Sequence, residues 1–463
     1  MTEKVGVLVV SYGAREAAIV DALCRSENYK VKIYDADKQR NPFILERCEA
    51  YEITGSNLDK ICEFAKKNKE NIDFAIVGYE EPIIKGVRNI LEKETNIPVI
   101  CPTKEYAVEG SKVYQRFLLE ECAPNCNPKF KVFYPKDYST VEEAKEELLK
   151  WLKELNTEVA VKPDTPAMGK GVGVWGDHFN TKEELWEHFL SIYKNCGVIV
   201  EEKIKGEEFS LQFFSDGKHL VATPAVRDYK RAFDNDLGAN TGGMGSYKAE
   251  KEYMPWMEEK DWRDAIEIGT KIFKKLRGNG NNVGLRGVPL YVAFTCTSEG
   301  LKIFELNSRP GDPEIQNLLP ILEDDFVEIC FAVLEGKLSE LKFAPKATVA
   351  TYAVPMTYGG YRTKYSGDRV VDLSGAYKLT EKYKDNIRVY PGSLELCEDG
   401  KIRALGSRAV CVVGIGATIE EAREISLAGI KAIDGALWNR WDIASKAHIE
   451  RSREHLKKLR MNL

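Results

Sequence analysis

The sequence predicts a multidomain protein in which an α/β region, an α+β region and a β-rich region follow one another along 463 residues. Short apolar stretches alternate with helical stretches over the first part of the chain, and strand-like runs dominate the last part. A length of this size accommodates about three domains at ~150 residues each. We therefore expect domains at residues 1–107, 108–330 and 331–463.

The N-terminal region has the pattern of a parallel sheet. Strands are expected at Val5–Val10, Lys30–Asp35, Phe74–Gly78 and Pro98–Cys101. A helix is expected around Ala17–Arg25, and further helical stretches separate the other strands. Strand and helix in alternation indicate parallel strands joined by right-handed crossovers. Ligands of such sheets bind at the carboxyl ends of the strands.

Two loops are predicted at that edge of the sheet. The first contains Gly13 and Arg15 and opens a helix whose amide groups can hold an anion. It has a single glycine and is not a GxGxxG fingerprint, so a dinucleotide is not expected. Arg15 either pairs with a phosphate or carboxylate, or is an ordinary surface arginine. The second loop, after the third strand, carries Glu80.

The middle region contains a glycine-rich loop. A helix carrying Lys112 and a connection at Cys122–Pro128 precede it. The strand Glu158–Lys162 then leads into the loop Pro163–Val174, which contains Lys170. The loop lacks the GxxxxGK[ST] spacing, which excludes a P-loop nucleotide site. We expect either a mobile flap whose amides and lysine close over phosphates, or a plain hairpin.

Three helix starts have the sequence of a capping box, in which a threonine and a glutamate satisfy the first amide groups of the helix. They are Thr140-x-x-Glu143, Thr181-x-x-Glu184 and Thr418-x-x-Glu421. After the last of them, the basic stretch Arg451–Arg460 is predicted to be a helix with a solvated face.

A polar, glycine-rich segment follows the middle strands. Val198–Val200 ends in Glu201 and Glu202, and an alternating strand follows at Phe209–Phe214. Arg227–Arg231 then precedes Asn240–Tyr247, which reads NTGGMGSY. Glycine, threonine and asparagine in such a run are typical of a backbone that approaches a ligand closely.

A predicted hairpin carries the strongest candidate for a metal site. Its strands lie at Pro289–Phe294 and around Phe304, with a turn at Ser298–Gly300. Glu305 and Asn307 are two residues apart and therefore point to the same face of the strand. A carboxylate and an amide oxygen are ligands that Mg²⁺ accepts while phosphates complete its shell. The loop after them holds Arg309, Asp312 and Glu314.

The last region is rich in strands, and composition limits the classes of function. Strands are expected at Thr348–Val354, Arg369–Leu373, Ile387–Val389 and Arg408–Ile415. The net charge is −5 and no run of Lys or Arg stands out, which disfavours nucleic-acid binding. No apolar run reaches the ~18 residues of a membrane span, and no signal pattern is present. We expect a cytoplasmic protein.

Together these motifs resemble the ATP-grasp superfamily and, within it, the phosphoribosylamine–glycine ligases. The similarity extends from residue 5 to about residue 455. Its most specific stretches are Asp228–Arg231, Asn240–Tyr247, Glu305–Arg309, Gly311–Glu314 and Arg440–Ile443. The resemblance implies an ATP-grasp fold with a pre-ATP-grasp N-terminal domain, a mobile lid at about 127–195 and a β-rich C-terminal domain.

The resemblance also implies a role for each candidate residue. ATP would be bound by Lys112, Lys162, Glu201, Glu202, Ile204 and Glu208, and Mg²⁺ or Mn²⁺ by Glu305 and Asn307. Catalytic roles would belong to Lys170, Arg309, Asp228 and Lys230. Glycine and 5-phosphoribosylamine would be bound by Gly13, Arg15, Glu80, Asn240, Thr241, Gly242, Asp312 and Glu314. The family implies a monomer or a weak homodimer.

Two departures from the family pattern leave alternatives open. Ala17 stands where the family has histidine, and Ala293 stands where a glutamine or glutamate provides another metal ligand. Glu299, Asp312 or water would then replace that ligand. The leading hypothesis is a ligase that makes glycinamide ribonucleotide. The alternatives are a related ligase with a different amine or acid, and a non-catalytic paralogue that binds nucleotides.

Overall fold

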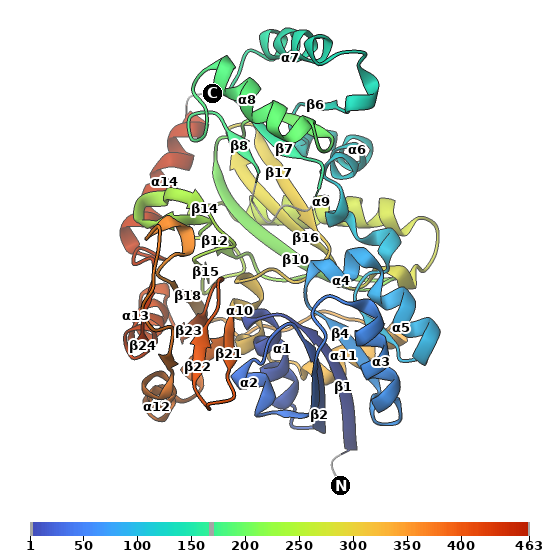
Figure 1. Cartoon of the computed structure of the whole chain (residues 1–463), viewed down its shortest axis with the longest axis vertical. Coiled ribbons are helices and arrows are strands. Elements are labelled where there is room, and N and C mark those ends of the chain that lie inside the picture. The colour runs from blue at the N-terminus through green and yellow to red at the C-terminus, as the bar shows by residue number, and fades with distance from the viewer. Residues whose placement is uncertain (1–2, 166–170, 462–463) are drawn as a thin grey trace.

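The computed structural model describes residues 3–165 and 171–461, and Figure 1 shows their arrangement. A parallel sheet lies at one end of the molecule, and the predicted lid, with two helices on a small sheet, lies at the other. Between them stands a sheet of long antiparallel strands. Lys170, predicted to be catalytic, lies outside the described residues. Among the described residues, no helix is long and apolar enough to cross a membrane.

The N-terminal sheet is parallel, as predicted, and has the order β3-β2-β1-β4-β5. Its strands are β1 (Glu3–Ser11), β2 (Tyr29–Asp37), β3 (Cys48–Ile53), β4 (Phe74–Val77) and β5 (Val99–Ile100). Helix α1 (Ala14–Cys24) packs on one face, and α3 (Leu58–Asn68) and α5 (Val87–Thr95) pack on the other. The sequence analysis missed β3, because this edge strand is half-exposed and has the polar sequence CEAYEI.

The central sheet is antiparallel, with the order β11-β10-β16-β17. Its strands are β10 (Glu207–Asp216), β11 (Leu220–Ala222), β16 (Arg286–Thr297) and β17 (Gly300–Asn307). Strands β16 and β17 form the predicted hairpin. Helices α6 (Lys112–Cys122) and α9 (Glu259–Arg277) contact each other and this sheet. The hairpin therefore has one strand, β17, at the sheet edge, next to α6.

The lid sheet has the order β6-β9-β7-β8. It contains β6 (Phe130–Phe133), β7 (Val159–Pro163), β8 (Gly173–Val174) and β9 (Val198–Glu202), with α7 (Val141–Leu155) and α8 (Lys182–Tyr193) packed on it. Thr181 and Glu184 form the predicted capping box at the start of α8. At α7 and α13 (Ile419–Lys431) the threonine caps the helix as predicted. The glutamate, however, accepts a hydrogen bond from the backbone N of the residue before the threonine.

The C-terminal sheet has the order β12-β15-β18-β23-β20, and β25 also pairs with β18. Its strands are β12 (Arg227–Asp228), β15 (Gly245–Lys248), β18 (Ala347–Pro355), β20 (Ile387–Pro391), β23 (Val410–Gly416) and β25 (Leu437–Trp438). Strands β12 and β15 precede residue 331, so the glycine-rich segment joins the sheet built by the last region. The division into 1–107, 108–330 and 331–463 stays a prediction.

The last helix, α14 (Lys446–Met461), confirms the predicted helix with exposed basic residues and adds a packed face. It is helical, but it also packs against the protein, since Ser452 and Leu456 are buried. Arg460 donates to Asp261 of α9 at 2.7 Å. The helix therefore has both exposed basic residues and a packed face, and a charge count alone did not reveal the packed face.

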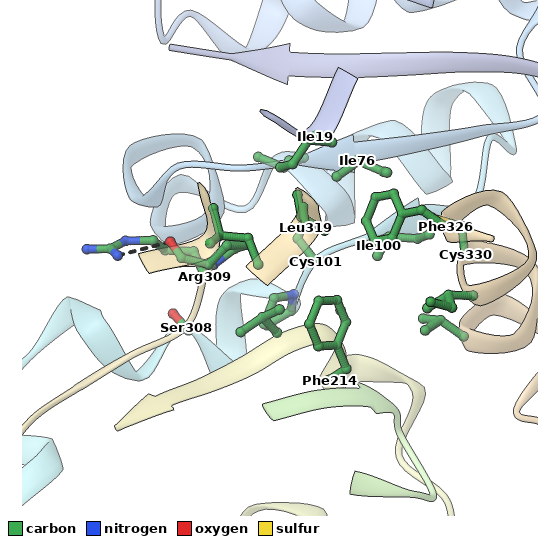
Figure 2. A pocket seen from close by; sticks show the side chains of 18 residues that line it. Ile19, Ile76, Ile100, Cys101, Phe214, Ser308, Arg309, Leu319, Phe326 and Cys330 are labelled. Carbon is green, nitrogen blue, oxygen red and sulfur yellow. Dashed lines mark hydrogen bonds between the residues drawn. The ribbon is translucent and has the colours of Figure 1, made fainter. Parts of the chain in front are cut away.

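A small apolar cavity lies behind the loop at residues 308–310, where the N-terminal sheet, the start of β16 and α11 (Phe326–Glu335) meet (Figure 2). Its volume is about 30 Å³, and Ile76, Ile100, Phe214, Phe326 and Cys330 are among the lining residues. Figure 2 shows the guanidinium of Arg309 pointing away from these apolar side chains. An apolar cavity of this size is expected to stay dry. The polar groups of this loop therefore lie on the side that faces away from the cavity.

The packing of β23 against α13 yields a test of the fold. A Cβ atom at Gly414 would lie 1.9 Å from the carbonyl oxygen of Ala422, and backbone atoms cannot yield cheaply. We expect Gly414→Ala to lower the free energy of unfolding by about 1–3 kcal/mol through overpacking. The measurement is a urea titration followed by circular dichroism. Gly406→Ala is the control, because a Cβ atom there meets open space. Equal unfolding midpoints for the two variants would contradict this packing.

Candidate active site

Helix α6 runs beside β17 and holds it through side chains. Gln115 Oε1 accepts a hydrogen bond from the backbone N of Leu306 at 2.9 Å. Arg116 donates to the carbonyl oxygens of Ile303 at 3.0 Å and Phe304 at 2.6 Å. These contacts satisfy polar groups of the sheet edge that would otherwise be unpaired. They also fix the strand that carries Glu305 and Asn307.

A buried ion-pair network joins this helix to the lid. Glu201 Oε1 lies 2.6 Å from Arg116 Nε, and Glu201 Oε2 lies 2.6 Å from Lys162 Nζ. All three side chains are buried. Burial would raise the pKa of Glu201, but Arg116 and Lys162 together lower it to about 2. The Glu201 carboxylate is therefore occupied by protein cations, and a ligand would meet this strand through its backbone.

The other residues predicted to bind nucleotide lie around the end of β9. Glu202 and Ile204 are half-buried, and Glu208 is exposed at the start of β10. The backbone amide of Glu202 is bonded to Lys129 O, and its carboxylate accepts a hydrogen bond from Lys129 N. Lys112, at the first position of α6, donates to the carbonyl oxygen of Thr165 at 2.8 Å. The candidates therefore gather at the junction of lid and central sheet.

Glu305 is surrounded by cations. Lys230 Nζ lies 3.5 Å from its carboxylate. Burial would raise the pKa of Glu305, but the positive charges nearby lower it to about 2. These charges belong to Lys230, Lys112, Arg309 and Lys162. Three of these cations, Lys162, Lys230 and Arg309, are paired with protein carboxylates in this structure, and a ligand with several negative charges would take over part of that pairing.

Asn307 is buried, and its amide oxygen lies on the side opposite Glu109. Its hydrogen-bonding surroundings assign the amide nitrogen to the side facing Glu109 Oε1 and Leu306 O, at 3.1 Å each. The oxygen therefore faces the opposite side. Together with Glu305 it offers hard oxygen ligands of the type that Mg²⁺ prefers. The described residues contain no cluster of three or more His, Cys, Asp or Glu side chains suited to a metal, so phosphate and water oxygens would have to complete the shell.

Ala293 lies directly opposite Glu305 across the hairpin. Two carboxylates, Glu299 and Asp312, were proposed to replace the metal ligand that Ala293 lacks, and neither is free at this position. Glu299 is in the turn, beyond Gly300, and six residues of extended chain put it roughly 20 Å from Glu305. Asp312 is engaged by Arg408 at 2.8 Å and by Tyr352 at 2.6 Å. Of the three substitutes considered, water is the one that remains.

Arg15 is buried, with 4% of its surface exposed, so the interpretation as an ordinary surface arginine is wrong. It donates to Glu16 and to the carbonyl oxygen of Pro310, each at 3.0 Å. Glu80 Oε2 lies 3.8 Å from Arg15 and 3.3 Å from Arg309. Burial would raise the pKa of Glu80, but the two arginines lower it. Gly13 begins α1 with a φ of 121°, a backbone conformation that favours glycine.

The glycine-rich segment is held by an arginine from the last region of the chain. Arg408 donates to the carbonyl oxygens of Gly242 at 2.7 Å and Asp312 at 3.0 Å. Thr241 donates to the carbonyl oxygen of Lys230 at 2.9 Å, and Asn240 pairs with Arg231 in a short hairpin. Sequence reasoning missed Arg408, because its contacts are made across long separations in the chain. A single arginine thus joins the predicted substrate-binding residues Gly242 and Asp312.

Asp228 and Glu314 form an acidic pair beside Lys230. Asp228 Oδ1 is buried without a hydrogen-bond partner among the described residues. Burial and the charge of Glu314 raise the pKa of Asp228 well above its usual range. Glu314 Oε1 accepts a hydrogen bond from Tyr291 at 2.6 Å. A Cβ atom at Gly243 would lie 2.5 Å from Asp228 Oδ1, so this segment requires glycine there.

Family models match residues 5–108 and 111–315, and relatives match almost the whole chain. Residues 5–108 match the model described as "Phosphoribosylglycinamide synthetase, N domain", and residues 111–315 match "Phosphoribosylglycinamide synthetase, ATP-grasp (A) domain". The phosphoribosylamine–glycine ligase of Methanocella arvoryzae is 37% identical over 460 residues, which are 98% of this chain and 99% of that protein. The same enzyme of Pyrococcus abyssi is 35% identical, with 98% of each chain covered.

Solved structures share the fold. A phosphoribosylamine–glycine ligase from Thermotoga maritima has a TM-score of 0.72 at 24% identity, covering 95% of this chain and 100% of its own. An N5-carboxyaminoimidazole synthetase from Staphylococcus aureus complexed with ADP has a TM-score of 0.62 at 11% identity, covering 93% and 98%. These structures establish the fold, and the full-length relatives establish the family. This chain belongs to the phosphoribosylamine–glycine ligase family of ATP-grasp proteins.

Proposed function

We propose that this protein joins glycine to 5-phosphoribosylamine through a glycyl-phosphate intermediate. The products are glycinamide ribonucleotide, ADP and phosphate, as in de novo purine biosynthesis. The observation that carries this proposal is the Glu305–Asn307 pair within a ring of four cations, in a chain related over its full length to such ligases. A monomer or weak homodimer and a cytoplasmic location stay predictions.

The first step needs a pocket that binds ATP phosphates. A glycine carboxylate does not lose oxide to an amine, so phosphoryl transfer from ATP must first make it a leaving group. Lys112, Lys162, Lys230 and Arg309 would hold the phosphates and stabilise the charge that develops during transfer. Mg²⁺ or Mn²⁺, held by Glu305 and Asn307, would supply further charge neutralisation at the phosphoryl oxygens. Lys170 is predicted to close over them.

The rest of ATP would lie between lid and central sheet. Because the Glu201 carboxylate is paired with Arg116 and Lys162, the adenine would meet backbone groups of Glu201, Glu202 and Ile204. Exposed Glu208 would contact the ribose. The buried network beneath this strand keeps it in place while the lid moves.

The second step is attack by the amine of phosphoribosylamine on the acyl carbon, which expels phosphate. The attacking amine must release a proton. Asp228 suits this task, because its raised pKa makes the carboxylate a stronger base and one of its oxygens has no partner among the described residues. The residues proposed to hold the substrates come from four segments of the chain: Gly13 and Arg15; Glu80; Asn240, Thr241 and Gly242; Asp312 and Glu314.

A substrate panel separates this function from the alternatives. The protein is incubated with Mg-ATP and single amino acids, with and without phosphoribosylamine, and phosphate release is measured. Release that requires both glycine and phosphoribosylamine supports the proposal. Release with another amine or acid identifies a related ligase, and no release with any pair indicates a non-catalytic protein.

The metal pair provides the most direct mutational test. We expect Glu305→Ala and Asn307→Ala each to reduce turnover by about 10²–10³-fold, because each removes a group that stabilises charge in the transition state. Steady-state phosphate release measures this, and circular dichroism checks the fold. Glu299→Ala is the control, since Glu299 lies in the turn of the same hairpin. Near-normal turnover in Glu305→Ala would refute the metal assignment.

Ala293 predicts an unusual metal dependence. Mg²⁺ keeps several waters and needs few protein ligands, so the missing oxygen should raise the metal requirement without stopping turnover. We expect activity to keep rising with Mg²⁺ beyond the concentration that saturates ATP. Ala293→Gln should shift this curve to lower Mg²⁺, and Ala293→Leu, of similar size without oxygen, should not. A wild-type curve that saturates with ATP, unchanged in Ala293→Gln, would show that the site is already complete.

An ion pair connects the lid to the body of the protein. Asp177, in the loop after β8, lies 2.5 Å from Arg231 beside the glycine-rich segment. Partly exposed pairs contribute about 0.2–1 kcal/mol, so Arg231→Glu should raise the KM for ATP by up to about fivefold. The reversed pair, Arg231→Glu with Asp177→Arg, should restore it. Failure of the reversed pair to recover the wild-type KM argues against a role for this contact in lid closure.

A further inference from the structure

Glu109 contacts three consecutive residues, Asn307 to Arg309, at the end of β17. Its Oε1 lies 3.1 Å from the Asn307 amide nitrogen and 3.2 Å from Arg309 Nη2. Its Oε2 accepts a hydrogen bond from the backbone N of Ser308 at 3.4 Å. One carboxylate, from the segment just before α6, therefore touches the side chain of Asn307, the backbone after it and the next arginine.

The contact with Asn307 has a chemical consequence. An asparagine amide has a donor end and an acceptor end of nearly the same shape, and only its neighbours decide which end faces which way. Glu109 Oε1 lies beside Arg309 Nη2 and Glu109 Oε2 beside Ser308 N, and because both neighbours can only donate, the Glu109 carboxyl acts as an acceptor here. Glu109 Oε1, together with the carbonyl oxygen of Leu306, therefore selects the orientation in which the nitrogen of Asn307 faces these two acceptors and the oxygen faces the opposite side.

The fold holds Glu109 in this place from both sides. Gln115 Nε2 donates to the carbonyl oxygen of Val108, and Gln115 Oε1 accepts from Leu306 N, at 3.1 and 2.9 Å. One amide side chain thus connects the residue before Glu109 to the residue before Asn307. Ser111, the N-cap of α6, accepts a hydrogen bond from Tyr114 N and fixes the start of the helix. These hydrogen bonds therefore hold the backbone on both sides of the Glu109–Asn307 contact.

We propose that Glu109 is a positioning residue of this active site, which turns the oxygen of Asn307 toward the divalent cation and holds Arg309 beside it. The inference rests on the proposed function, because it requires Asn307 to be a metal ligand. Glu109 itself is not placed as a ligand, since both of its oxygens are taken by donors from residues 307–309. Groups of this kind typically change metal affinity 10–100-fold when removed.

Binding of Mn²⁺ in the presence of ADP, followed by electron paramagnetic resonance, tests the proposal without turnover. We expect Glu109→Ala to weaken Mn²⁺ binding about tenfold or more. Glu120→Ala is the matched control, because Glu120 is an exposed glutamate of α6, and it should leave binding unchanged. Glu109→Gln preserves the size of the side chain and one acceptor oxygen, and should lose less affinity than Glu109→Ala. Circular dichroism accompanies each variant.

A second substitution separates positioning from a purely structural role. Asp at position 307 presents an oxygen whichever way it turns. In the Glu109→Ala background, Asn307→Asp should therefore restore Mn²⁺ binding. In the wild-type background it should weaken binding, because the new carboxylate faces that of Glu109. Unchanged Mn²⁺ affinity in Glu109→Ala, or no recovery in the double variant, would overturn the proposal.

The same assay distinguishes this inference from the proposed function. If Asn307→Ala leaves Mn²⁺ affinity unchanged, the metal assignment fails, and the proposed role of Glu109 fails with it. If Asn307→Ala weakens binding and Glu109→Ala does not, Asn307 keeps its role and only the positioning role of Glu109 is lost. If both Asn307→Ala and Glu109→Ala weaken Mn²⁺ binding, and Asn307→Asp restores it in the Glu109→Ala background, the metal assignment and the positioning role are both supported.

Discussion

The buried Glu201 carboxylate is the interaction on which the site depends. It binds Arg116 of α6 and Lys162 of the lid sheet, each at 2.6 Å. Arg116 also donates to two carbonyl oxygens of β17, so one network joins the lid strands, the helix and the hairpin that carries Glu305 and Asn307. Removing one partner of a buried ion pair typically costs ~3–5 kcal/mol, because the other charge stays buried and unpaired. The lid is therefore anchored at its base while its outer loop is held by weaker surface contacts.

This anchoring gathers cations and carboxylates around β17. Lys112, Lys162, Lys230 and Arg309 surround Glu305. Without a polyanionic ligand, these charges are balanced by protein carboxylates, among them Glu201, Glu80 and Glu109. The charges are thus fixed before a ligand arrives, and electrostatic stabilisation by such a preorganised site requires little rearrangement during the reaction.

The loop at residues 309–314 is where all regions of the chain meet. Arg15 of α1 donates to Pro310 O, and Arg408, just before β23, binds Asp312. Behind the loop lies the apolar cavity, whose lining comes from the N-terminal sheet, β16 and α11. The loop is therefore polar toward the site and apolar toward the core. A rigid support of this kind suits side chains that must hold two substrates in a fixed position relative to each other.

Local patterns were enough to predict the fold class and to single out Glu305 and Asn307 as a candidate pair. Alternating strands and helices predict a parallel sheet, and Glu305 and Asn307 share a face because strand side chains alternate. Tertiary structure alone decided which other charges join them. Glu109 and Arg309 are 200 residues apart, and Arg15 and Pro310 are 295 residues apart. Such contacts leave no periodic signal, because they arise when separate elements pack against one another. The packing also showed that Arg15 is buried and brought Arg408 to the glycine-rich segment.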